Sequence, residues 1–411
     1  MMLRPASSLP FVLCYVFAMF GAFIAFVPLV GLILPQKIAA LSGVADSGGP
    51  VRALSWLLVA GGIMAGFSNI AAGHISDRLF ARLGSRRALI MVGLALVIAA
   101  LALFDRAQSF TGLVLAMLAF QLALNLLLSP LVALMVDYIA DEYKGSTAGW
   151  LGLALPVGSL SVSLLVVLRP IGPVNELAVT ALLTAVLVMP LALLWPVPSR
   201  AARHVSTSTA AGLPQQPGLA RNFSLAWVAR LFVQFAAAAI LPYLYYYVTD
   251  VARLGKTPAQ ISDAVGLLAF IFALASTAGG LGAGWMSDRI GRRQPVLVTT
   301  ALMVSLGMIL LASAQSWVLI VTAYALFAAG LAGFLAVDNA LVAQLVSSSN
   351  HRATLLGVMN LTNTLPSIMA PAATLFLVGG SAVGMVITLK AAAAGAVFAA
   401  LCSSQIRSAR Q

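Results

Sequence analysis

Two ionisable residues, Arg230 and Asp338, lie inside long apolar stretches of the sequence. A charged side chain in the middle of a bilayer costs about 2.5–3.5 kcal/mol on insertion scales, so each needs a partner or a purpose. At about 1.5 Å per residue, Arg230 lies ~9 Å and Asp338 ~12 Å from the same membrane face. An ion pair between them is therefore expected. A carboxylate that alternates between an arginine and a proton can couple proton movement to another process, whereas a static pair would only be structural.

Carboxamide side chains recur at helical spacing in the same kind of stretch. Residues three or four positions apart lie on one helix face, so the members of each set point the same way. Such amides can contact a polar solute, or they can hydrogen-bond to neighbouring helices as packing contacts. The sets are Gln121 with Asn125, Arg230 with Gln234, Asp338 with its neighbour Asn339, and Asn360 with Asn363.

The sequence contains no arrangement of residues typical of an enzyme or a metal site. Cys14 and Cys402 lie inside apolar stretches near opposite ends of the chain and give no disulfide framework. The three histidines have no cysteine or acidic neighbour at metal-ligand spacing. Phosphate-binding loops, nucleophile elbows and paired catalytic carboxylates do not occur. We therefore expect no enzymatic activity, no metal and no cofactor.

Composition indicates a membrane protein. Charged residues make up 8% of the 411 residues, against about a quarter in soluble domains. Hydrophobic residues reach 61% and the mean hydropathy is +1.03, which suits lipid better than water. The expected fold class is an all-α membrane protein with short loops.

Twelve apolar stretches are long enough to cross a bilayer. They are residues 10–34, 51–73, 88–104, 110–138, 147–168, 174–195, 225–248, 264–286, 295–314, 318–346, 354–378 and 383–402. Lysines and arginines outside or at the ends of these stretches number 15 on one side and 6 on the other, so the positive-inside rule predicts two cytoplasmic termini. The net charge of +12 is then a topology signal, and no nucleic-acid partner is expected.

An internal repeat divides the chain into two halves. The segment from Gly73 to Arg78 after the second stretch recurs as Gly284 to Arg289 after the eighth, at an offset of about half the chain. The polar interval 197–224 lies between the halves. We therefore predict two transmembrane bundles, each with six helices and similar to the other. The predicted boundaries are 1–196 for the N-terminal bundle, 197–224 for a cytoplasmic linker and 225–411 for the C-terminal bundle.

These residues resemble the major facilitator superfamily of transporters. Its loop signature, G-x-x-x-D-R-x-G-R-R, is closely matched by the residues from Gly284 to Arg293. The longer first copy looks like that of the glycoside and sucrose cation symporters, and the segment from Asp137 to Gly145 resembles the end of the superfamily's fourth helix. The resemblance implies twelve helices in two pseudo-symmetric bundles, transport by alternating access, and function as a monomer.

The repeated loop is expected to gate the cytoplasmic side. Asp77 and Asp288 lie at helix ends, where a carboxylate can face the positive N-terminal end of a helix in the other half. Nearby arginines would pair with these aspartates or with Asp137 and Asp141, although they could also serve only to set topology. The predicted gating residues are Gly73, Asp77, Arg78, Arg86, Arg87, Asp137, Asp141, Gly284, Asp288, Arg289, Arg292 and Arg293.

Helices 1, 4, 7 and 10 line the central cavity in that superfamily, which implies which amides contact substrate. Tyr15 on helix 1 would form an aromatic wall, and Asp338 with Arg230 would carry proton coupling. The predicted substrate contacts are Tyr15, Gln121, Asn125, Gln234, Asn339, Asn360 and Asn363.

The expected function is secondary active transport of a small organic solute in the lipid bilayer of the bacterial inner (plasma) membrane. Protons are the expected coupling ion, because helices 1 and 2 contain no acidic residue that could help hold sodium. Mostly apolar cavity helices favour efflux of an amphipathic compound. A sugar-type uptake symporter and a non-transporting membrane sensor or assembly protein of the same fold remain as alternatives.

Overall fold

The computed structural model of the 411-residue chain describes residues 9–41, 49–139, 141–169, 175–193, 219–252, 257–347, 352–378 and 382–406. Most of the predicted linker 197–224 lies outside these ranges. Its last six residues, 219–224, belong to helix α9 (Leu219–Ile240), so the helix starts earlier than the hydropathy pattern predicted. The side chain of Asp141 also lies outside the described part.

All regular structure in the described residues is helical, as the sequence predicts. In the N-terminal half the helices are α1 (Leu9–Pro28), α2 (Leu34–Ala40), α3 (Pro50–Leu83), α4 (Arg87–Arg106), α5 (Phe110–Tyr138), α6 (Asp141–Leu151), α7 (Ala154–Leu168) and α8 (Glu176–Leu193). In the C-terminal half they are α9, α10 (Leu244–Tyr246), α11 (Pro258–Ile290), α12 (Gln294–Ser313), α13 (Trp317–Ser347), α14 (Arg352–Val378) and α15 (Ala382–Ser404). A π-helical turn over Leu29–Ile33 joins α1 to α2 in one continuous rod.

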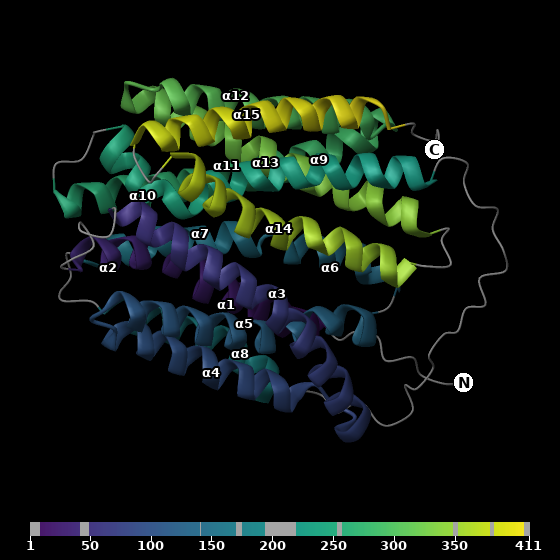
Figure 1. The fold of residues 1–411 in the computed structure, drawn as a ribbon. Coiled ribbons are helices and arrows are strands. Elements are labelled where there is room, and N and C mark those ends of the chain that lie inside the picture. Colours follow the sequence, from purple (N-terminus) through teal and green to yellow (C-terminus); the bar gives the residue numbers. More distant parts are fainter. Residues whose placement is uncertain are drawn as a thin grey trace. The chain divides into compact units, whose positions relative to one another are not determined.

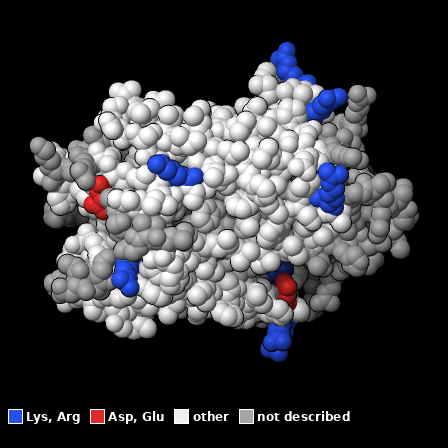
Figure 2. Space-filling model, turned by 45° about the horizontal axis from the view of Figure 1, so that its top comes forward, with Lys and Arg blue, Asp and Glu red and all other residues white. Residues whose placement is uncertain are grey.

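Eleven helices in the described residues are long and apolar enough to cross a membrane. The predicted stretch 354–378 is also helical, as α14, but it is not among the eleven. Large apolar side chains are widely exposed, including Phe67 at 71% and Phe376 at 75%. Figure 2 shows only scattered charged side chains on the face in view. An apolar exterior of this kind suits contact with lipid, so the protein is an integral membrane protein.

The chain divides into two compact units. The first comprises Met1–Val44 and Ala60–Val205, and the second comprises Ala45–Val59 and Ser206–Gln411. The second unit therefore includes the first ten residues of α3. Within that unit, the buried hydroxyls of Ser55 and Tyr243 are hydrogen-bonded at 2.7 Å.

Close helix contacts build each unit. In the first, α1 packs against α7 and α8, and α4 packs against α5. In the second, α13 packs against α11 and α12, α12 lies beside α15, and α9 contacts both α14 and α15 (Figure 1). Small residues allow these approaches. A Cβ atom on Gly93 of α4 would lie 2.7 Å from the backbone nitrogen of Leu127 in α5, so that crossing requires glycine.

Candidate functional site

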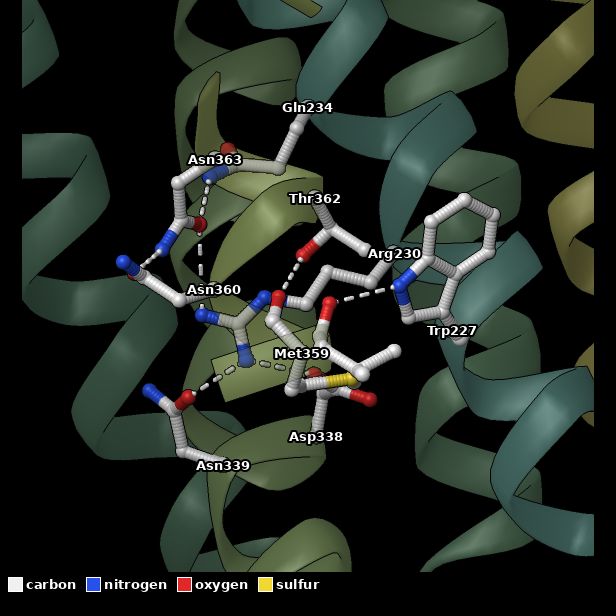
Figure 3. Close-up of polar contacts among 10 residues, drawn as sticks. Trp227, Arg230, Gln234, Asp338, Asn339, Met359, Asn360, Thr362 and Asn363 are labelled. Atoms are coloured by element: carbon white, nitrogen blue, oxygen red, sulfur yellow. Dashed lines mark hydrogen bonds and ion pairs between the residues drawn. The ribbon is translucent and has the colours of Figure 1, made fainter. Parts of the chain in front are cut away.

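The expected ion pair between Arg230 and Asp338 is present in the second unit. Arg230 lies on α9 and Asp338 on α13, and the Nη1 to Oδ2 distance is 3.0 Å (Figure 3). The Asp338 side chain is 1% exposed and that of Arg230 is 12% exposed. Two opposite charges thus meet inside membrane-spanning helices, where neither would be stable alone. Their role in proton coupling remains a prediction.

A network of carboxamides surrounds the guanidinium group. Arg230 also donates to Oδ1 of Asn339 at 2.8 Å and to Oδ1 of Asn363 at 3.4 Å. Gln234 Nε2 donates to the same Asn363 oxygen at 2.8 Å, and Asn363 Nδ2 donates to Asn360 Oδ1 at 3.0 Å. Three helices, α9, α13 and α14, supply these groups. The spacing of four residues on α9 and of three residues on α14 puts the members of each set on one helix face. The structure therefore brings six of the predicted residues together (Figure 3).

Two buried atoms in the network have no hydrogen-bond partner among the described residues. They are Asp338 Oδ1 and Arg230 Nε. Most buried polar atoms in proteins are paired, and an unpaired one costs about 1–3 kcal/mol, so such atoms often belong to functional sites. The free carboxylate oxygen leaves one position at which Asp338 can accept a proton without first giving up its bond to Arg230.

Two further residues support the network, and the sequence reasoning did not identify them. The indole nitrogen of Trp227 donates to the carbonyl oxygen of Val358 at 2.8 Å, which ties α9 to α14 one turn from Arg230. Thr362 is buried and donates to its own helix at Met359 (2.6 Å). The spacing of three between Trp227 and Arg230 was the available signal, because it puts both on the same face of α9.

The predicted contacts of the first unit do not form such a network. Gln121 and Asn125 on α5 are 7% and 6% exposed. Asn125 donates to the Gln121 carbonyl at 2.8 Å and accepts from Asn69 of α3 at 3.2 Å. These are the hydrogen bonds of a packing contact between α3 and α5, which was the alternative interpretation of these amides. A substrate role for them stays a prediction.

Tyr15 is fully buried in α1, which differs from the expected aromatic wall. Its exposed fraction is 0%, and its hydroxyl has no hydrogen-bond partner among the described residues. No face of the ring is open to solvent in this structure.

The first copy of the loop signature is centred on Arg86, whose side chain is only 6% exposed. Its guanidinium binds Asp137 at the end of α5 at 2.6 Å, and Asp77 near the end of α3 at 3.1 Å. It also donates to the Ser76 hydroxyl and stacks over the Phe80 ring at 4.7 Å. Arg86 therefore joins the ends of two helices of the first unit, as the predicted pairing requires.

Other predicted gating residues of this copy make fewer contacts. Gly73 has open space at its Cβ position. Arg78 and Arg87 are exposed, and neither forms an ion pair with an aspartate in the described ranges. Gly84 has a φ of 67°, which lets the chain turn sharply after α3.

The second copy turns in the same way but pairs differently from expectation. Gly291 has a φ of 65°. Within the described parts of the chain, no ion pair joins Asp288 to Arg289, Arg292 or Arg293. Arg289 instead stacks over the Trp285 ring at 5.1 Å, and Gly284 has open space around it. The expected pairing of these arginines with Asp288 stays a prediction for this copy.

The two copies also differ in the sequence of the neighbouring helix. Arg293 corresponds to Arg86, and its Nη1 is buried without a hydrogen-bond partner among the described residues. Burial lowers the pKa of the Arg293 guanidinium, and the nearby Asp288 carboxylate partly opposes this by raising it. The end of α5 reads Leu131 to Asp137, whereas the matching end of α13 reads Leu341 to Ser347. Serine thus replaces the aspartate that anchors Arg86.

Substituting Arg86 by glutamine is expected to lower the free energy of unfolding by about 1.5–3 kcal/mol, the usual cost of losing hydrogen bonds to a charged group. The change would also leave Asp137 without its cation. Thermal unfolding of the purified protein in detergent measures the effect. Arg87→Gln is the matched control, because Arg87 is exposed and should change stability by less than about 0.5 kcal/mol. Equal effects from both variants would show that Arg86 sets topology only.

Comparison with known proteins points to one family. The family model of the Major Facilitator Superfamily matches residues 226–407. No curated protein matches the chain. Among solved structures, the chain is similar to a bacterial homologue of the human lysosomal transporter Spinster in an inward-facing, unoccupied conformation, with 15% identity, 98% coverage of each chain and a TM-score of 0.63. The same homologue in an inward-facing, occupied conformation gives 15% identity, 98% and 97% coverage, and a TM-score of 0.62.

At this identity the structural likeness establishes the fold, and the family model identifies the C-terminal half directly. Both agree with the loop signature at Gly284 to Arg293, which lies inside the matched segment. Residues 226–407 thus match the family model of the Major Facilitator Superfamily, and the whole chain has the fold of the bacterial Spinster homologue.

Proposed function

We propose that this protein is a secondary active transporter that moves a small organic solute by alternating access and is coupled to protons. The observation that carries the coupling is the buried Arg230–Asp338 pair between α9 and α13. Ionisable residues inside membrane helices are expensive, and proton relays in transporters are a common reason for retaining them.

The pair has two chemically distinct states. With Asp338 ionised, the carboxylate and guanidinium neutralise each other. With a proton on the unpaired Oδ1, Asp338 is neutral and Arg230 keeps its hydrogen bonds to Asn339 and Asn363. A change of protonation can drive a conformational change only if the two conformations bind the proton with different affinity. The carboxamides connect the Arg230–Asp338 pair to the exposed face of α14. A solute bound there can interact with the charge of the pair.

The remaining roles follow the family pattern. The proposed transporter consists of an N-terminal bundle (1–196), a cytoplasmic linker (197–224) and a C-terminal bundle (225–411). Both termini lie in the cytoplasm of a bacterium, and the protein works as a monomer. The two copies of the loop signature gate the cytoplasmic side, with Arg86 as the anchor of the first copy. Tyr15, Gln121 and Asn125 contribute to the cavity of the N-terminal bundle when the conformation changes.

The direction of transport can be decided from the sign of proton movement. Efflux driven by an inward proton gradient requires exchange of solute for protons, whereas uptake requires movement of both in the same direction. The apolar cavity helices favour efflux of an amphipathic compound on composition alone.

Replacing Asp338 by asparagine is expected to abolish proton-coupled flux, because asparagine cannot exchange a proton. Solutes that stabilise the purified protein are selected from sugars, organic acids and amphipathic drugs. The protein is then reconstituted in liposomes that contain a pH-sensitive dye, and a pH gradient is applied with each solute. Solute-dependent proton flux in the natural protein should fall to the level of protein-free liposomes in the Asp338→Asn variant.

Asp263→Asn is the matched control, because Asp263 is exposed on α11 and lies in no ion pair among the described residues. This variant should retain full flux. Solute flux that ignores the pH gradient, or that survives Asp338→Asn unchanged, would make the pair structural and the protein a uniporter or exchanger.

A further inference from the structure

The orientation of every carboxamide around Arg230 follows from the chemistry of the guanidinium group. Arginine has five N–H donors and no acceptor. The amide atoms of Asn339 and Asn363 that lie against it must therefore be oxygens, as Figure 3 shows. Oxygen and nitrogen of an amide are otherwise hard to distinguish, but here a fixed cation decides the assignment.

The orientation of Asn363 also fixes the orientation of the next amide in the hydrogen-bonded series. Because the Asn363 oxygen faces Arg230, its nitrogen faces Asn360, so the Asn360 oxygen must accept. The NH2 groups of Asn339 and Asn360 then have no hydrogen-bond acceptor within the described residues, and both asparagines are exposed. Gln234 donates to Asn363 through its nitrogen, so its side-chain oxygen stays available as an acceptor. The network therefore presents mainly hydrogen-bond donors to whatever lies beside it.

The net charge of the network depends on the protonation state of Asp338. While Asp338 is ionised, it cancels the charge of Arg230 at 3.0 Å. Once Asp338 is protonated, the site has a net positive charge and two open NH2 groups. An anion gains most from such a site, because hydrogen bonds to an ionised acceptor are about twice as strong as neutral ones.

No other charged group competes for this role. The helices packed against α13 are α9, α11, α12 and α14. Their charged residues within the described segments are Arg221 and Arg230 on α9, Asp263, Asp288 and Arg289 on α11, and Arg352 at the start of α14. Among the side chains that the structure describes, only that of Arg230 lies within ion-pair distance of Asp338. The protonation state of Asp338 alone therefore sets the charge of the network.

We propose that Arg230 and the NH2 groups of Asn339 and Asn360 bind the carboxylate of an organic acid, and that they do so together with a proton on Asp338. The inference rests on the proposed function and names its substrate class. Proton and anion occupy the site in the same state, so they move in the same direction, as a symporter. This sign opposes the preference for efflux that composition alone suggests.

The test measures binding and proton uptake together. Acetate, benzoate and naphthoate, each paired with its uncharged amide, are titrated into the purified protein by calorimetry at about pH 7.5, where an ordinary aspartate is ionised. Buffers of different ionisation enthalpy report the protons taken up. We expect at least one acid, and none of the amides, to bind with uptake of about one proton, and the Kd to fall up to about tenfold per pH unit of acidification.

Variants of the pair sharpen the expectation. Asp338→Asn imitates the protonated state, so it should bind the acid without proton uptake and without pH dependence, although its coupled flux is lost. Arg230→Gln should not bind the acid, whereas Arg221→Gln, on the exposed start of the same helix, should bind it like the natural protein.

Three results would overturn the inference: amides that bind as well as acids, binding of the acid without proton uptake by the natural protein, or no acid binding to either the natural protein or Asp338→Asn. The proposed function fails separately. Acid binding with proton uptake but no pH-driven flux would remove transport and leave the anion site. Proton-driven flux of a neutral solute, without acid binding, would do the reverse.

Discussion

Arg230→Gln lowers the free energy of unfolding by about 3–5 kcal/mol in our expectation, because it leaves the Asp338 carboxylate buried without its cation. Asp338 is 1% exposed, so water cannot replace the lost partner in the folded protein. Asn339 and Asn363 would lose a charged donor at the same time. Denaturant or thermal unfolding in detergent gives the difference.

The double variant Arg230→Gln with Asp338→Asn separates a charge effect from a packing effect. Removing both charges leaves two amides that can hydrogen-bond to each other, so much of the lost stability should return. Arg221→Gln is the control for loss of an arginine on α9 and should change stability by less than about 0.5 kcal/mol. If the double variant is as unstable as the sum of the two single variants, the pair is not coupled and its assignment as an ion pair is wrong.

The second large effect is expected at Gly279 on α11, where two helices touch. A Cβ atom at this position would lie 2.3 Å from the backbone oxygen of Ala329 on α13 and 2.5 Å from its Cα. Backbone atoms cannot rotate away as a flexible side chain can, so α11 and α13 must separate. Gly279→Ala should therefore cost about 3 kcal/mol, at the upper end of the usual range for overpacking. Since α13 carries Asp338, proton-coupled flux should fall as well.

Gly282→Ala is the matched control for this change, because it lies on the same helix and has nothing within 4 Å of its Cβ position. Alanine favours a helix over glycine by about 1 kcal/mol, so this variant should be neutral or slightly more stable. The yield of folded protein and its unfolding temperature compare the two. Indistinguishable variants would mean that α11 and α13 do not pack as closely as the structure has them.

The features that could be predicted from the sequence depend on residues that are close together along the chain. The length of an apolar run and the cost of a charge inside it depend on the residues themselves, so the membrane class, the helices and the isolation of Arg230 and Asp338 could be inferred directly. Helical spacing also put Gln234 on the face of Arg230, and Asn360 on the face of Asn363.

Spacing gives a common face, however, and leaves open which neighbour that face meets. Gln121 with Asn125 and Asn360 with Asn363 look alike in sequence, yet the first set packs against α3 and the second joins the network at Arg230. The rotation of each helix about its axis decides this, and it is set by the packing of all the neighbouring helices together. The burial of Tyr15 has the same origin.

The two copies of the loop signature also combine predictable local structure with contacts that depend on the tertiary structure. Their glycine and arginine spacing in the sequence predicted two similar turns, and both turns occur, with positive φ at Gly84 and Gly291. The pairing of Arg86, however, depends on Asp137, about fifty positions away, at the end of a helix that only the folded chain brings near. Sequence by itself determined that this is a helical membrane protein with a repeated loop and with Arg230 and Asp338 inside apolar stretches. The tertiary structure decided which polar groups meet, because hydrogen bonds and ion pairs act over a few ångströms between segments that are distant along the chain.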